Sequence, residues 1–128
     1  MTLYRIRMEQ ARGKDRPEGE AGRGYEFIAP LARDGTLDPE AWKAAKAICT
    51  VRRFAPDGAE EHGHLAHGRW GWRFHYDGAL EGPVDDEEEP IFRLDAKRLA
   101  VGEYLAVAEE DGRAVTFRIV SVTKSPLA

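Results

Sequence analysis

Three histidines close together are the strongest candidates for chemistry in this sequence. His62, His64 and His67 follow the spacing H-x-H-x-x-H, and in an extended chain the first two side chains project to the same side. Three imidazole ligands with a fourth position open to water are the arrangement that catalytic zinc requires. One hypothesis is therefore a small metal-dependent enzyme that holds zinc or another divalent metal on these three histidines.

The flanking residues exclude the two metal-binding families with the most similar spacing. The motif resembles the H-x-H-x-D-H signature of metallo-β-lactamase-fold hydrolases, but Ala66 stands where the second metal needs an aspartate. A cupin-type site needs a glutamate a few residues on and a distant third histidine. No histidine follows His75, so the sequence supplies neither set of ligands.

The adjoining stretch RWGWRFHY, residues 69–76, alternates aromatic and polar side chains, which predicts a half-buried strand. One face carries Trp70, Trp72, Phe74 and Tyr76, and the other carries Arg69, Arg73 and His75. A platform for stacking bases is disfavoured, because the arginines that would neutralise phosphate point away from the aromatic rings. We expect the aromatic face to form core. The polar face becomes a candidate binding surface for an anionic group, joined by Arg118 if its strand lies alongside.

The elements that must position these residues are mostly strands. Alternation and turn residues predict strands at 2–8, 24–31, 50–54 and 91–94, and a hairpin over 103–122 that turns at Asp111–Gly112. Residues 10–24 are expected to form a mobile loop or an extended hairpin connection, and residues 77–90 an acidic loop. Residues 55–63 are expected to be a turn-rich connection leading into the histidines. The single predicted domain, 1–128, is therefore α+β, with a curved, mostly antiparallel, barrel-like β-sheet.

One helix is predicted at about 38–48. Asp38 can cap its first turn, and Pro39 suits the first helical position. Trp42, Ala45, Ile48 and Cys49 recur at spacings of three and four, so we expect this face to pack on the sheet.

Composition limits the classes of partner. The chain has 128 residues and a net charge of −4, and the balance falls from +2 over residues 1–24 to −4 over 85–128. Nucleic acid is therefore an unlikely partner, because phosphate binding favours a basic excess. The first ten residues lack the apolar run of a signal peptide, no stretch is long enough to span a membrane, and Cys49 is the only cysteine. We expect a cytoplasmic protein.

The C-terminal hairpin resembles a small bacterial protein family with a GEY…DG…TFRIVSV pattern and no established activity. The matching residues are Gly102, Glu103, Tyr104, Asp111, Gly112, Thr116, Phe117, Arg118, Val120, Ser121 and Val122. The hairpin is also similar in rhythm to the closing strands of PUA-like and ASCH-like barrels, which bind RNA or nucleotides. The G-x-K-x-x-E-x-R signature of the ASCH type is missing here, so this likeness is one of shape.

The sequence leads to three functional hypotheses. The first is a non-catalytic module that binds a small molecule or a protein on the polar face of strand 69–76, without a cofactor. The second is the metal-dependent enzyme with its site on His62, His64 and His67. The third is a nucleic-acid-binding PUA-like barrel module. We prefer the first, because no nucleophile–base pair or pair of carboxylates at a defined spacing is recognisable.

Overall fold

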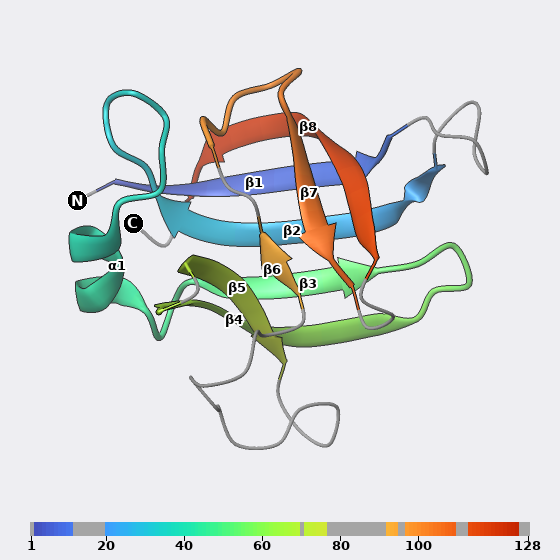
Figure 1. Ribbon diagram of the computed structural model, residues 1–128, viewed down its shortest axis with the longest axis horizontal. Coiled ribbons are helices and arrows are strands. Elements are labelled where there is room, and N and C mark those ends of the chain that lie inside the picture. Colours follow the sequence, from blue (N-terminus) through green and yellow to red (C-terminus); the bar gives the residue numbers. More distant parts are fainter. Residues whose placement is uncertain are drawn as a thin grey trace.

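A computed structural model of the chain describes residues 2–11, 20–69, 71–76, 92–94, 97–109 and 113–125. Within these ranges eight strands form a closed antiparallel barrel, and each strand pairs with its neighbours in chain order (Figure 1). The strands are β1 Leu3–Gln10, β2 Glu20–Pro30, β3 Thr50–Phe54, β4 Glu60–Gly68, β5 Gly71–Tyr76, β6 Arg93–Leu94, β7 Tyr104–Ala108 and β8 Ala114–Lys124. One helix, α1 Pro39–Ala45, lies between β2 and β3.

The first and last strands close the barrel. Ile6 on β1 lies opposite Phe27 on β2 and also opposite Val122 on β8. An interior enclosed by eight strands is just wide enough for side chains to fill it. Alternate residues of the strands point inward and form a core that includes Ile6, Met8, Tyr25, Phe27, Val51, Leu65, Phe74, Tyr76, Val107, Phe117 and Ile119.

The predicted barrel-like antiparallel sheet is confirmed, but the described chain is mostly β rather than α+β. Its helix is shorter than the predicted 38–48. Asp38 caps it by accepting hydrogen bonds from the backbone N–H groups of Glu40 and Ala41, each at 3.1 Å. At the other end the N–H of Ile48 bonds to the carbonyl of Ala45, so the chain tightens into a turn and leaves Ile48 40% exposed.

The helix is anchored to the barrel through Trp42. Its indole N–H donates to the carbonyl oxygen of Leu65 on β4 at 2.9 Å, in a buried position. Trp42 and Ala45 are both buried, as the predicted helix face requires. The helix therefore lies at one end of the barrel, and the β3–β4 connection lies at the opposite end (Figure 1).

The histidine segment is a strand, which corrects the prediction of a turn-rich connection over 55–63 leading into loop histidines; the turn covers only residues 55–59. β4 runs over nine residues, in which the buried Gly63 and Leu65 alternate with the more exposed His62 and His64 on the other face. The next strand begins at Gly71, not at residue 69, because Gly71 makes the turn with a φ of 88°. Arg69 lies in this turn and is exposed.

Several predicted features fall wholly or partly outside the described residues. Trp70, the acidic loop 77–90 and the Asp111–Gly112 turn are among them. The predicted mobile loop 10–24 is shorter than expected, because β1 extends to Gln10 and β2 begins at Glu20; residues 12–19 are not described. No helix in the described part of the chain is long and apolar enough to cross a membrane.

Candidate functional site

The pairing of β4 with β5 gathers polar side chains on the outer wall of the barrel. His64 lies directly opposite His75, and Ala66 lies opposite Arg73. A guanidinium nitrogen of Arg73 is 3.4 Å from Nδ1 of His75. On the inner side of the same strand, Phe74 and Tyr76 are buried, and Trp72 packs against the core. The predicted division of strand 69–76 into an aromatic core face and a polar face is confirmed for the described residues 71–76.

The structure does not bring the three histidines of the H-x-H-x-x-H motif together. His62 and His64 lie on the outer wall, whereas the ring of His67 contacts those of Trp42 and Trp72 at centroid distances of 6.0 and 4.3 Å. In the described ranges no group of three or more histidine, cysteine, aspartate or glutamate side chains is placed to hold a metal ion.

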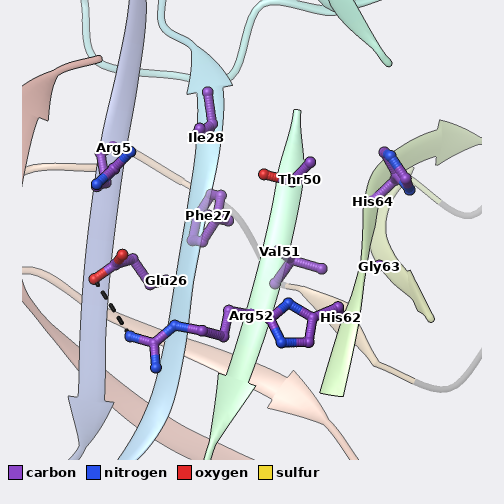
Figure 2. A pocket seen from close by; sticks show the side chains of 10 residues that line it. All are labelled: Arg5, Glu26, Phe27, Ile28, Thr50, Val51, Arg52, His62, Gly63 and His64. Atoms are coloured by element: carbon purple, nitrogen blue, oxygen red, sulfur yellow. Dashed lines mark ion pairs between the residues drawn. The ribbon is translucent and has the colours of Figure 1, made fainter. Parts of the chain in front are cut away.

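A shallow depression opens on the outer wall where β1, β2, β3 and β4 run side by side (Figure 2). Its volume is about 340 Å³. We call it the outer depression; it is lined by Arg5, Glu26, Phe27, Ile28, Thr50, Val51, Arg52, His62, Gly63 and His64. Two guanidinium groups, two imidazoles and a hydroxyl therefore surround it, with Glu26 as the carboxylate in the lining.

The strand pairing explains why these side chains meet. Arg5 on β1 lies opposite Ile28 on β2, and Thr50 on β3 lies opposite His64 on β4. Ile28 is 6% exposed and forms an apolar part of the floor. His64 is also the cross-strand partner of His75, so the outer depression adjoins the polar face of β5.

Arg52 is held in place from several directions. Its guanidinium bonds to Glu60 at 2.6 Å and lies 3.8 Å from Glu26. It also lies over the ring of Phe54 at 5.0 Å, and Arg7 covers the same ring at 4.3 Å. The hydrogen bond from Arg52 lowers the pKa of Glu60. The guanidinium is thus preorganised at the edge of the outer depression.

Two of the predicted binding residues lie elsewhere. Arg118 is exposed on β8, opposite Tyr104 on β7 and Glu9 on β1, so its strand does not lie alongside β5. Arg69 occupies the turn that precedes β5. Neither side chain lines the outer depression.

Sequence reasoning missed a second polar cluster, which lies inside the barrel. Arg53 forms ion pairs with Glu109 at 3.0 Å and Glu61 at 3.3 Å, and the Tyr25 hydroxyl donates to Glu109. Burial is the main cause that raises the pKa values of Tyr25 and Tyr76 above the ordinary tyrosine value. The alternation of side chains along β3 and β4 could have revealed the cluster. Arg53 is two residues from Val51, and Glu61 is two residues from Gly63, so each points to the inside of the barrel with its buried neighbour.

Cys49 is buried at the start of β3, where burial raises the pKa of its thiol to about 11. Its burial agrees with the predicted packing of Trp42, Ala45 and Cys49 on the sheet, whereas Ile48 of the same predicted face is exposed.

Comparisons with known proteins found no matching family model, no similar curated protein and no similar solved structure. The resemblance of the C-terminal hairpin to a bacterial family stays a prediction.

Proposed function

We propose that this protein is a binding module that takes a small anionic ligand in the outer depression. The observation that carries the proposal is the lining, in which three strands, β1, β3 and β4, place Arg5, Arg52, His62 and His64 around one hollow, with the Thr50 hydroxyl between them. Guanidinium, imidazole and hydroxyl groups are all hydrogen-bond donors to oxyanions. The predicted binding face, with Arg73 and His75, continues this surface across the β4–β5 pair.

The acidic net charge is compatible with an anionic ligand. Residues 77–91 contain seven of the 23 acidic side chains and none of the 19 basic ones. The rest of the chain therefore carries three more basic than acidic side chains. The local field at the outer depression is set by the cations that line it.

The chemistry of the ligand follows from the number of donors. A phosphate or sulfate group has several oxygens that can share donors from different strands, whereas a single carboxylate fits one guanidinium fork. We expect an oxyanion of this type, and the apolar floor at Ile28 leaves room for a carbon skeleton beside it. A cytoplasmic location agrees with such a ligand and stays a prediction.

Sulfate is the best first probe, because it keeps its charge across the range in which histidine titrates. We expect saturable backbone amide shifts in 15N-labelled protein at Thr50, His62 and His64 as sulfate is added. Arg5→Gln should weaken binding by about 10-fold, because a hydrogen bond to a charged group contributes about 1.5 kcal/mol.

A matched control tests whether the effect is local. Arg118→Gln removes an exposed arginine on the outer surface of β8 that does not line the outer depression, and it should leave sulfate affinity unchanged. Equal loss in the two variants, or shifts spread over the whole barrel surface, would contradict a built site. Zinc in place of sulfate tests the metal hypothesis, which requires a stoichiometric complex that His64→Gln abolishes.

A further inference from the structure

The barrel end away from α1 is closed by a ring of side chains, with one residue from each strand or from the position next to it. We call these residues the mouth ring: Gln10, Tyr25, Arg53, Glu61, Tyr76, Phe92, Glu109 and Phe117. Register and ring contacts connect them around the interior. Tyr25 lies opposite Arg53, Arg53 opposite Glu61, and Gln10 opposite Phe117. The rings of Tyr76 and Phe92 are 4.6 Å apart.

The charges of the mouth ring do not balance. Glu61 and Glu109 share one guanidinium, that of Arg53. Tyr25 and Tyr76 stay neutral because burial raises their pKa values. Taken over its eight members, the mouth ring therefore carries one excess negative charge, in a place where uncompensated charge is expensive.

Three buried oxygens of the mouth ring also lack hydrogen bonds. They are Oε1 of Gln10, Oε2 of Glu61 and the hydroxyl oxygen of Tyr76, none of which has a partner among the described residues. Tyr76 is 1% exposed. The nearest hydroxyl is that of Tyr25, and its polar interaction with Tyr76 lowers the pKa of Tyr76, against the larger effect of burial. Tyr25 donates its own proton to Glu109, however, so it supplies no donor to the Tyr76 oxygen. Orphaned buried polar atoms are rare in proteins, and each costs about 1–3 kcal/mol.

We propose that the mouth ring is a second binding site, separate from the outer depression, and that it takes an ammonium group, either as the free ion or as a small primary amine. All three orphaned atoms can accept a hydrogen bond, and an ammonium group offers only donors. Its positive charge also offsets the excess carboxylate. A water molecule could bridge some of these atoms, but it would leave the charge unbalanced. The carboxylates exclude an anion.

The site has an entry path. The side chains of Arg53, Glu109 and Glu61 are 21%, 14% and 30% exposed, so the charged part of the mouth ring reaches solvent while Tyr76 lies deeper. The mouths of β-barrels are also common places for small-molecule sites. A cation can therefore reach the carboxylates of Glu61 and Glu109 from solvent.

The test compares cations at constant ionic strength. Thermal unfolding of the full chain is followed in ammonium, methylammonium, potassium and tetramethylammonium chloride. At ten times its Kd, a ligand of the folded state raises Tm by about 4 °C in a chain of this length. We expect a saturable rise with ammonium, and with methylammonium if the mouth admits a carbon substituent. Potassium and tetramethylammonium, which have no N–H donors, should give none.

Two variants locate the effect. Glu61→Gln removes the excess charge and Tyr76→Phe removes the buried hydroxyl, so each should abolish the rise. Glu60→Gln, one residue along β4 on the outer wall, is the matched control and should preserve it. A direct readout that does not depend on stability is the bound 15N-ammonium signal, which Glu61→Gln should remove.

An equal Tm rise with potassium, or an unchanged response in Glu61→Gln, would overturn the proposal, as would the absence of any cation effect. The outcome is independent of the outer depression, since sulfate binding and ammonium binding are measured on different residues with different probes.

Discussion

Replacing Arg53 by methionine tests whether the polar cluster inside the barrel behaves as buried charge. Methionine keeps much of the length of the arginine stem but removes the guanidinium that pairs with Glu61 at 3.3 Å and Glu109 at 3.0 Å. It also removes the contact of the cation with the ring of Phe92, 5.1 Å away. Both carboxylates are then left without their cation inside the barrel mouth.

The magnitude follows from burial. Removing one partner of a buried ion pair destabilises a protein by about 3–5 kcal/mol. Arg53 is 21% exposed and Glu109 14%, so partial solvation places the expected loss at the low end, about 3 kcal/mol. Urea unfolding followed by tryptophan fluorescence measures the change, and in a thermal scan it corresponds to a fall in Tm of about 10 °C.

Arg52, the residue next to Arg53, provides the control. Arg52→Met removes an arginine from the same strand that also has two carboxylate partners, but on the outer wall, where Arg52 is 32% and Glu60 41% exposed. The loss there should be below about 1 kcal/mol. Glu109→Gln, added to Arg53→Met, should recover about 2 kcal/mol, because it removes one stranded charge and keeps an acceptor for Tyr25. Equal losses for Arg53→Met and Arg52→Met would refute the reasoning, since solvent would then screen both sites alike.

Three further predictions concern single buried groups. Because the folded-state pKa values of Tyr25 and Tyr76 are raised, their contribution to stability is complete below pH 10 and is lost above it. The free energy of unfolding should fall by about 2.7 kcal/mol per pH unit there, and absorbance at 295 nm should show two tyrosines ionising only on unfolding. Cys49, with a pKa of about 11, should not react with Ellman's reagent at pH 8 until urea unfolds the chain, and rapid labelling of folded protein would contradict its burial. Gly63→Ala places a Cβ against the carbonyl of His75, so it should cost at least about 2 kcal/mol and weaken sulfate binding; a stable variant with normal affinity would show that the two strands can separate freely.

The elements that could be predicted from sequence are those whose local pattern is unambiguous. Asp38 and Pro39 marked the helix start, and the alternation of residues 71–76 marked both faces of β5. β4 was missed because its polar positions carry histidine and its inward positions include Gly63. Glycine is depleted in strands, so Gly63 indicated a loop in the sequence. In the structure it allows the backbone of β4 to lie close to that of β5.

The candidate sites were harder to predict because they depend on barrel closure. Arg5 and His64 are distant in sequence and meet only because β1, β2, β3 and β4 are consecutive strands of one curved sheet. The pattern of residues within one strand does not determine which residues of the neighbouring strands lie opposite it. The inner cluster was missed for a different reason: Arg53 and Glu61 are charged, and reading strands by polarity assigns charged side chains to solvent.

Strands β3 and β4 form a common wall for both proposed sites. Arg52 and Arg53 are adjacent in sequence but point to opposite sides of the sheet, and Glu60 and Glu61 do the same on the next strand. A slip of one residue in the pairing would turn the inward side chains of a strand outward and its outward side chains inward. The mouth ring would then lose its charged residues, and the outer depression would lose its cations. Both proposed sites therefore depend on this register, as does the packing of the core. Gly63 helps to fix it, because only a residue without a side chain fits so close to the backbone of β5.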